Sequence, residues 1–419
     1  MFRFSVDGSH GIIVSADHQG ECRGSDPRRD VRIGFNAQLL SYGQWYRSAG
    51  ISRYIDRTLA GLRNYLPADS SIAFVGPDVP ADAPSLQWLR LVRTGLPTHR
   101  PLARILWEQA VLPSAARRLG LDVLHAPAYV APLVSTCPSV VTFHDLSFYI
   151  MPDAFNLQNR LYLQVFSRLA ARRARRLIAV SEATRRDLVR LLGVDPARID
   201  VIYNGVDERF QPEGDLERVA RFRAAQSLPE QFILYLGTLE PRKNIPVLLR
   251  AYAAARQQGV SAPLIIAGGR GWRDQMIAPL IEQLGIADSV RLVGFVPMDE
   301  QALWYNAATL FAFPSRYEGF GFPVLEAMAC GTPVVASNCS ALPEIVGDAG
   351  VLVDPDAPEQ LAEALVLLLR DAERREDFAR RGRQRAERFT WDEAARATLE
   401  SYHQAVNAPQ SLPAMKKRG

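Results

Sequence analysis

Residues 314–333 read PSRYEGFGFPVLEAMACGTP, and this stretch decides the expected fold. Pro314 ends an apolar strand, a glycine-rich turn follows, and a helix of good formers begins near Pro323, whose missing N–H has no partner in a first turn. Free N–H groups and the helix dipole would face this turn, which predicts an anion site. Glu318 and Glu326 flank the turn and could both face one bound molecule.

The chain has 419 residues, a hydrophobic fraction of 48% and a formal net charge of +4. This length predicts about two or three domains, and the composition is typical of a globular protein. So small a charge gives no reason to expect nucleic acid as a partner. No apolar run is as long as a membrane helix, and the apolar patch at 11–16 is too short for a signal peptide. We therefore expect a cytoplasmic protein.

The sequence lacks the motifs that are typical of several functional classes. The four cysteines (Cys22, Cys137, Cys330 and Cys339) show no C-x-x-C pair and no zinc-ligand spacing, so reduced thiols are expected. The absence of G-x-x-x-x-G-K-[ST] excludes a P-loop, and no G-x-G-x-x-G follows the first strand, which weakens a dinucleotide oxidoreductase. No H-E-x-x-H motif or carboxylate cluster predicts a metal.

Strand and helix patterns alternate along the chain. The first half predicts strands at residues 31–35, 122–125, 139–143, 177–180 and 199–203, a helix at 51–66, and a helix that Ser181 caps and Gly193 ends. The second half predicts strands at 232–236, 264–267, 290–293, 309–313, 334–337 and 351–352, and helices at 359–370 and from the Thr390 capping box to about 406. The alternation predicts an α/β fold of two doubly wound, Rossmann-like domains facing each other across a cleft.

The domain boundaries follow from composition. Residues 1–30 lack periodicity and are expected to lie outside the fold. The polar stretch 207–215 predicts a linker between an N-terminal domain at 31–206 and a C-terminal domain at 207–391. The last helix, about 392–406, is assigned to the N-terminal domain, and the basic tail at 407–419 is expected to be disordered.

The candidate residues follow strands, where ligands of open α/β sheets bind. In GTLEPRKN (237–244), Asn244 could cap the next helix, and Arg242 and Lys243 would suit a diphosphate, although a solvated basic turn is the alternative. GFVP (294–297) offers a backbone edge for a flat base. His144 follows the strand SVVTF.

A basic segment in the first half has two interpretations. Residues 166–193 carry eight arginines and two acidic residues among apolar positions. The run is either a solvated face with extended arginine side chains or a surface for an anionic membrane.

Together these motifs resemble glycosyltransferase family 4, the retaining, nucleotide-sugar-dependent enzymes of the GT-B fold. The resemblance rests on GTLEPRKN (237–244), AGG (267–269), GFVP (294–297), the glutamate pair, VSEATRRDL (180–188), NGVD (204–207) and FTW (389–391). It covers about residues 32–404 and is most specific in the second half.

The resemblance implies a role for each matching position. Arg242 and Lys243 would bind the donor diphosphate, Glu318 the hydroxyls of the transferred sugar, and Glu326 the ribose. His144 would lie beside the sugar. The implied donor-binding set also includes Phe320, Gly321, Phe322, Gly237, Val296 and Gly50. The family needs no bound metal.

Two positions depart from the family pattern. Many members have additional glycines before the first helix, where this chain has Ala49, Gly50, Ile51 and Ser52. Some carry an arginine where this chain has Thr238, so Arg242 and Lys243 would carry more of the charge.

The resemblance implies transfer of a hexose, first mannose from GDP-mannose, to a glycan or lipid-linked acceptor of bacterial polysaccharide or O-antigen assembly, with possible contact at the inner face of the cell membrane. A UDP-sugar donor is the first alternative. A nucleotide-sugar 2-epimerase and a non-catalytic nucleotide-sugar-binding protein are the others.

Overall fold

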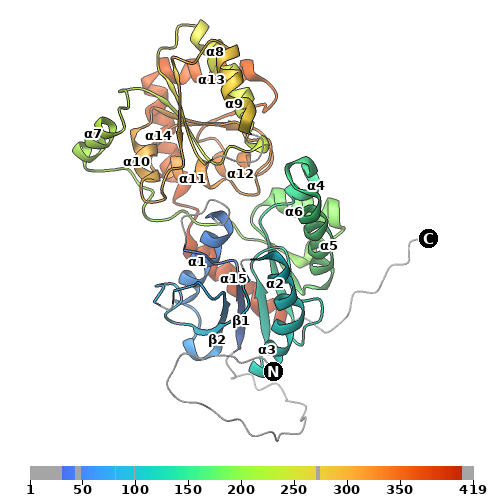
Figure 1. Ribbon diagram of the computed structural model, residues 1–419. Coiled ribbons are helices and arrows are strands. Elements are labelled where there is room, and N and C mark those ends of the chain that lie inside the picture. Colours follow the sequence, from blue (N-terminus) through green and yellow to red (C-terminus); the bar gives the residue numbers. More distant parts are fainter. Residues whose placement is uncertain (1–30, 43–48, 81, 99, 270–273, 408–419) are drawn as a thin grey trace, which may run out of the picture.

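The computed structural model describes residues 31–42, 49–80, 82–98, 100–269 and 274–407, which form two α/β domains (Figure 1). The predictions for residues 1–30 and for the tail after residue 407 lie outside these ranges. Each domain is built on a sheet of parallel strands, and the chain passes once from the first sheet to the second.

The first domain contains a seven-stranded sheet of order β3-β2-β1-β4-β5-β6-β7. Its strands are β1 (Ile33–Ala37), β2 (Ser71–Val75), β3 (Arg90–Arg93), β4 (Val123–Ala126), β5 (Ser139–Phe143), β6 (Arg176–Ala179) and β7 (Ile199–Val201). Its helices are α1 (Ala49–Leu62), α2 (Pro101–Leu106), the π-helical turn η3 (Trp107–Val111), α3 (Leu112–Leu119), α4 (Ser147–Ile150), α5 (Leu157–Arg173) and α6 (Glu182–Leu192).

The second domain contains a six-stranded sheet of order β10-β9-β8-β11-β12-β13. Its strands are β8 (Ile233–Leu236), β9 (Leu264–Ala267), β10 (Val290–Gly294), β11 (Leu310–Phe313), β12 (Val334–Ser337) and β13 (Val351–Val353). Its helices are α7 (Leu216–Ala225), α8 (Ile245–Gln257), α9 (Ile277–Gln283), α10 (Gln301–Ala307), α11 (Phe322–Ala329), α12 (Leu342–Val346), α13 (Pro358–Arg370) and α14 (Ala372–Ala386).

Both sheets have the doubly wound order, so the α/β prediction is confirmed. In each sheet the chain starts at a central strand, moves to one edge, and then crosses to the other side. The crossing point lies between the neighbouring strands β1 and β4 in the first domain and between β8 and β11 in the second. A crevice opens at the carboxyl ends of such a strand pair, and ligands bind there.

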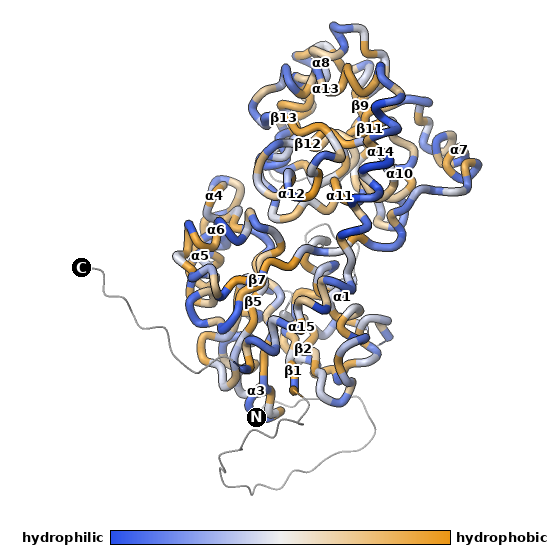
Figure 2. The backbone as a smooth tube through the Cα atoms, turned by 180° about the vertical axis from the view of Figure 1, so that it is seen from behind, coloured by the Kyte–Doolittle hydropathy of each residue, from blue (hydrophilic) through white to orange (hydrophobic). Residues whose placement is uncertain are grey.

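Several elements do not appear among the predicted ones, and they include two strands and two highly charged helices. The strands β2 and β3 are short, and β3 is an edge strand with arginine at both ends. The helices α7 and α14 are so rich in charged residues that hydrophobic periodicity is weak. In Figure 2 the tube of α14 is coloured mostly as hydrophilic, whereas strands β9, β11 and β12 are coloured mostly as hydrophobic.

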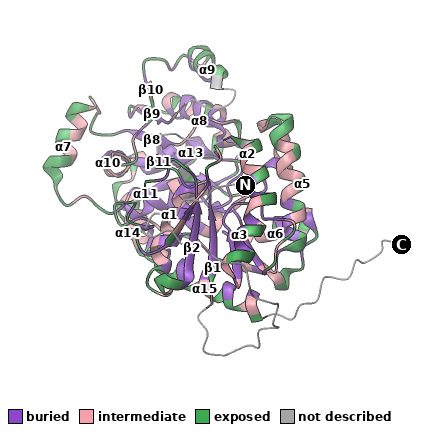
Figure 3. Cartoon of the chain, turned by 60° about the horizontal axis from the view of Figure 1, so that its bottom comes forward, coloured by how far each residue is buried: buried purple, intermediate pink, exposed green. Residues whose placement is uncertain are grey.

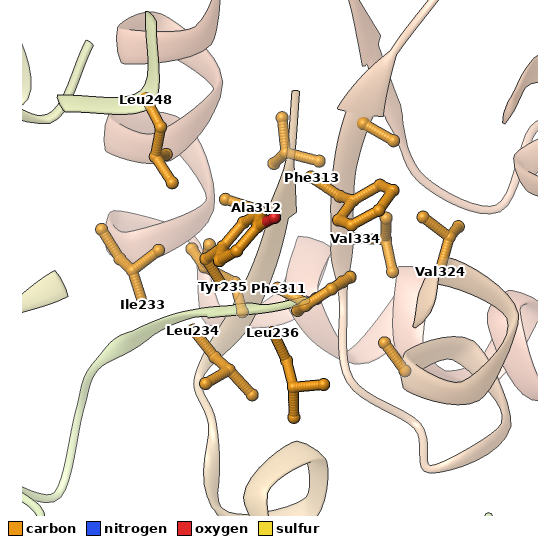
Figure 4. Close-up of a cluster of buried hydrophobic side chains, with 14 of the residues drawn as sticks. Ile233, Leu234, Tyr235, Leu236, Leu248, Phe311, Ala312, Phe313, Val324 and Val334 are labelled. Carbon is orange, nitrogen blue, oxygen red and sulfur yellow. The ribbon is translucent and has the colours of Figure 1, made fainter. Parts of the chain in front are cut away.

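Buried apolar side chains fill the space between each sheet and its helices. Figure 3 shows the labelled strands β1 and β2 as buried. In the second domain, Phe311 and Phe313 of β11 pack with Tyr235 of β8, and Phe313 stacks on Tyr235 with ring centroids 5.9 Å apart (Figure 4). This core fixes the ends of β8 and β11, and the polar loops of the candidate site follow them directly.

The last helix, α15 (Trp391–Asn407), leaves the second domain and packs on the first (Figure 1). Tyr402 on α15 reaches the buried His125 of β4, with 2.7 Å between the hydroxyl and Nδ1. The other ring nitrogen lies 2.9 Å from the Thr142 hydroxyl, which also contacts the Tyr54 hydroxyl. This network joins α15, two strands and α1 in one buried polar chain.

The buried His125 should make stability depend on pH. Burial, with a smaller contribution from His144, lowers its pKa from 6.5 to about 3. The unfolded chain therefore binds a proton that the folded chain excludes, so stability is present above pH 6.5 and is lost as pH falls toward 3. The free energy of unfolding should decrease by up to about 1.4 kcal/mol per pH unit in that window.

Urea unfolding at several pH values measures this dependence. His125→Asn should flatten the slope below pH 6.5, whereas His403→Asn, at an exposed position of α15, should leave it unchanged. An unaltered slope in His125→Asn would show that another group causes the pH dependence.

Candidate functional site

The candidate site lies at the carboxyl ends of β8 and β11, the two strands beside the crossing point of the second sheet. The loop after β8 carries Arg242 and Lys243 in a short 3₁₀ turn. The loop after β11 carries Glu318 and leads into α11. Parallel pairing of the two strands brings these loops to the same sheet edge.

Glu318 joins the two cations in one cluster. Its Oε1 accepts hydrogen bonds of 2.6 Å from Lys243 Nζ and 2.6 Å from the Ser315 hydroxyl. Its Oε2 accepts a 2.8 Å bond from Arg242. Glu318 and Lys243 are 7% and 6% exposed, so the ion pair is shielded from water. Such a pair interacts more strongly than one on the surface.

The residues of this cluster shift one another's pKa values. Burial tends to raise the pKa of Glu318, but Arg242 and Lys243, with the Ser315 hydrogen bond, outweigh it and hold the pKa at about 2. Burial and the neighbouring Arg242 together lower the pKa of Lys243, against the pull of Glu318. The carboxylate therefore stays ionised at neutral pH, and it neutralises charge that an anionic ligand would otherwise meet.

The turn between the two glutamates places the start of α11 at the same site. Gly321 occupies the N-cap position in a left-handed conformation (φ 109°) and has no side chain with which to cap the helix. The helix begins at Phe322, so Pro323, which was predicted as the first helical residue, is the second residue of the first turn. Phe320 is buried, and its ring lies 5.2 Å from that of Phe322.

Glu326 belongs to a second cluster, which sequence reasoning missed. Its Oε2 accepts a 2.9 Å hydrogen bond from Tyr305, and its Oε1 pairs with Arg53 of α1 in the other domain. Arg53 also pairs with Asp207 at 3.1 Å, and its guanidinium lies 4.7 Å from the Phe322 ring centroid. Burial opposes the charge of Arg53, but Glu326 and Asp207 outweigh it and raise its pKa.

The two domains touch beside Glu318. A Cβ added to Gly319 would lie 1.6 Å from the backbone oxygen of His144, so only glycine fits between the two chains. The hydroxyl of the adjacent Tyr317 donates to Asp187 at 2.8 Å and accepts from the Leu146 N–H at 3.0 Å. These contacts hold the loop after β5 against the loop after β11.

A carboxylate from the second domain caps a helix of the first. Glu344 on α12 accepts hydrogen bonds from the N–H groups of Glu182 and Ala183, at 2.8 and 2.7 Å. Ser181 caps α6 as predicted and accepts from the Thr184 N–H at 3.1 Å. Nothing in the sequence indicated the role of this glutamate, because its partners are backbone groups 161 and 162 residues away in the chain.

His144 lies at this contact, at the end of β5. Its Nε2 donates to the Pro127 carbonyl at 2.7 Å, and its ring meets those of Tyr54 and Tyr129 edge to face. Burial lowers its pKa against the effect of the Pro127 carbonyl and Asp145. The imidazole is thus held neutral and oriented, while its backbone oxygen faces Gly319.

Two local predictions were wrong. Asn244 does not cap α8 with its side chain, because it adopts a left-handed conformation (φ 61°) and donates to the Pro355 carbonyl at 2.6 Å instead. Gly50 does not precede the first helix but is the second residue of α1, where it is exposed with open space around it.

The remaining predicted donor-binding residues lie at the same sheet edge. Gly237 follows β8, and its N–H donates to Ala267 at 2.9 Å. A Cβ on Gly268 would lie 1.9 Å from the Gly237 oxygen, so the loops after β8 and β9 are in close contact. Val296 follows β10 and is buried. Within the described ranges, no three His, Cys, Asp or Glu side chains gather as metal ligands would.

Two family descriptions match the chain, one in each half. Residues 48–210 match "Glycosyltransferase Family 4", and residues 218–385 match "Glycosyl transferases group 1". The chain is 34% identical over 265 residues to the O-antigen chain mannosyltransferase B of Escherichia coli, covering 63% of this chain and 70% of that protein. It is 35% identical over 249 residues to the D-inositol 3-phosphate glycosyltransferase of Segniliparus rotundus, covering 58% of this chain but only 55% of that relative.

Solved structures share the two-domain fold. The sucrose-phosphate synthase of Thermosynechococcus elongatus superimposes with a TM-score of 0.67 at 24% identity, covering 90% of this chain and 96% of that chain. The Anabaena protein HepE, solved with UDP and glucose, gives 0.69 at 23% identity and coverage of 89% and 99%.

Proposed function

The chain belongs to the glycosyltransferases of group 1 and family 4, and we propose that it moves a hexose from a nucleoside diphosphate sugar to a glycan or lipid-linked acceptor, with retention at the anomeric carbon. The GT-B fold expected from the resemblance is confirmed by the solved structures that share it. The reaction would serve bacterial polysaccharide or O-antigen assembly, as the name of the Escherichia coli relative suggests.

The cluster of Glu318, Arg242 and Lys243 carries this proposal. As the anomeric C–O bond of the donor breaks, negative charge grows on the departing diphosphate. Cations that are already fixed at that position stabilise the transition state more than the ground state. A donor diphosphate would compete with Glu318 for both cations, and the displaced carboxylate would then accept hydrogen bonds from hydroxyls of the transferred sugar.

The second cluster suits the nucleoside part of the donor. The Glu326 side chain is an acceptor that Tyr305 and Arg53 orient, and a ribose diol offers two hydroxyl donors to such a group. Because Arg53 holds the carboxylate in the structure, donor binding would have to share or replace that contact. The N–H groups at the start of α11, from Phe320 to Phe322, would meet the diphosphate beside it.

GDP-mannose is the first donor that we propose, because of the similarity to a mannosyltransferase. UDP-sugars are the alternative, since HepE was solved with UDP. We propose that no bound metal takes part, because Arg242 and Lys243 supply the positive charge that a metal would otherwise bring.

A thermal-shift screen of nucleotide sugars tests this function. A donor that binds only the folded chain raises the melting temperature as its concentration increases. GDP-mannose or a UDP-sugar should raise it with and without EDTA. No stabilisation by any nucleotide sugar, or stabilisation that needs manganese, would contradict the proposal.

We further propose that an anionic membrane holds the enzyme near a lipid-linked acceptor. Helix α5 carries four arginines and no acidic residue. Leu157, Leu161 and Val165, which are spaced four residues apart along it, are all exposed. The neighbouring α2 adds Leu102 and Leu106, which are 82% and 59% exposed. We refer to these five exposed side chains together as the α2–α5 surface. Its apolar stripe and basic flanks suit anionic lipid headgroups. Among the described residues, no helix has the length and apolar character needed to cross a bilayer.

Sedimentation with phosphatidylglycerol vesicles tests the α2–α5 surface. Leu161→Glu should weaken vesicle binding about tenfold, because it removes an inserted apolar side chain and adds a like charge. Leu216→Glu is the matched control, since Leu216 is 78% exposed on α7 of the second domain. Equal binding by both variants and the wild type would exclude this surface.

A further inference from the structure

Three buried polar side chains of the first domain lack the hydrogen bonds that they could make. Both polar atoms of the Gln38 side chain, Asn36 Oδ1 and Glu108 Oε2 have no partner. The three residues are 6%, 5% and 4% exposed. A buried polar atom without a partner costs about 1–3 kcal/mol, so a cluster of such atoms needs an explanation.

The cluster lies where the first sheet would bind a ligand. Asn36 is in β1, and Gln38 follows the end of that strand. The two residues are therefore close together at the carboxyl end of the same strand. β1 and β4 are the strands at the crossing point of this sheet, the counterpart of β8 and β11 in the donor domain. Ligands bind in crevices at such points. On the same edge of this sheet, the backbone oxygen of His144 after β5 lies against Gly319 of the second domain.

The π-helical turn η3 brings Glu108 to this crevice. Trp107 and Glu108 are consecutive and both buried, and the wider turn gives both room to point inward. Trp107 packs against Phe74 of β2, with 5.7 Å between the ring centroids, while Glu108 Oε1 accepts from Asn36 at 3.1 Å. Turns of this kind recur at functional sites.

Charged and polar groups on two helices surround Glu108. Burial raises its pKa to about 7, whereas Arg104 of α2, Asn36 and Tyr162 of α5 oppose the rise. Both α2 and α5 contribute to the α2–α5 surface, so the crevice adjoins the side of the domain proposed to meet the membrane.

We propose that Gln38, Asn36 and Glu108 bind the hydroxyl groups of the acceptor sugar, a pyranose presented from the α2–α5 surface. This inference rests on the proposed transferase function and names the acceptor side of the same reaction. Gln38 offers an amide donor and an acceptor, and the free Asn36 and Glu108 oxygens offer acceptors, a set that suits vicinal hydroxyls. The indole N–H of Trp107, which is also unpaired, adds a donor.

The distance between the ends of β1 and β5 is about that spanned by one sugar ring and its linkage. His144 follows β5, and β4 separates that strand from β1. Neighbouring strands are about 4.8 Å apart, so the ends of β1 and β5 lie roughly 10 Å apart. An acceptor ring held over β1 and β4 could therefore direct a hydroxyl toward a donor sugar beside His144.

Saturation-transfer NMR with octyl α-D-mannopyranoside tests the site, because the ring protons report on the crevice and the chain protons on the apolar surface. Gln38→Met and Glu108→Gln should each weaken the ring-proton contact about tenfold. The chain-proton contact should persist. Gln87→Met, at an exposed position, should behave as the wild type.

Stability separates a binding role from a structural one. Replacing an unpaired buried amide with an apolar group of similar shape is neutral or stabilising, so Gln38→Met should melt at or above the wild-type temperature while losing ring contact. Ring signals that are absent in the wild type, equal in all variants, or lost only together with stability would overturn the inference. Donor binding in the thermal-shift screen is independent of this result, so a protein that binds donor but shows unchanged ring contacts would refute the acceptor site alone.

Discussion

Lys243→Ala is expected to lower kcat by about a hundredfold or more, as the loss of one preorganised charge in a buried site does. The ammonium is buried, lies 2.6 Å from Glu318, and sits over the Phe313 ring at 4.7 Å. No water can easily replace it there, so charge on the departing diphosphate would be left to Arg242. Substrate binding should change less than turnover, because the contact strengthens as the C–O bond breaks.

Arg316→Ala is the matched control for this substitution. Arg316 is a cation in the same loop as Glu318, but its side chain is exposed and pairs with the exposed Asp356. Surface ion pairs contribute little, so turnover should stay within about twofold of the wild type. Near-normal turnover in Lys243→Ala would show that Lys243 does not stabilise the departing diphosphate.

Gly319→Ala is expected to have a comparably large effect for a steric reason. The added methyl group would lie 1.6 Å from the His144 oxygen and 2.9 Å from the Asp145 Cβ, and the first of these is backbone that cannot rotate away. The two domains must separate by an ångström or more to relieve the contact. A misplacement of about 1 Å costs roughly a hundredfold in rate, and we expect kcat to fall by that order.

Each domain should still fold in the Gly319→Ala variant, because residue 319 lies in a loop and the added methyl group clashes only with the other domain. Gly95→Ala is the control, since a Cβ there meets nothing within 4 Å. Steady-state kinetics and small-angle scattering together measure the effect. Full activity with an unchanged radius of gyration in Gly319→Ala would mean that the contact between the two loops is not part of the active arrangement.

The donor half of the site could be predicted from the sequence, because each of its residues lies close in the chain to the end of a strand. Arg242, Lys243 and Glu318 each follow an apolar strand within a few residues, so the rule for parallel sheets was enough to bring them together. Phe320, Gly321 and Phe322 follow from the turn that leads into α11. Their roles toward a donor remain predictions.

The contacts between the domains could not be predicted in the same way. Arg53 lies in the second turn of the amphipathic helix α1, and nothing in its neighbours indicates that it reaches Glu326, 273 positions away. Asn244 fits the pattern of a helix cap, but the left-handed turn directs its amide to Pro355. The crevice of Gln38 and Glu108 was equally hidden, because an unpaired amide is recognisable only after all its neighbours are known.

Calorimetric titration with nucleotides can measure whether Arg242 and Lys243 bind the donor diphosphate. Wild-type protein should bind GDP or UDP more tightly than the matching monophosphate, because the second phosphate meets both cations. In the Arg242→Ala/Lys243→Ala double variant, that preference should shrink by about tenfold or more, while monophosphate binding changes little. An unchanged preference for the diphosphate in the double variant would show that these two cations do not bind the second phosphate.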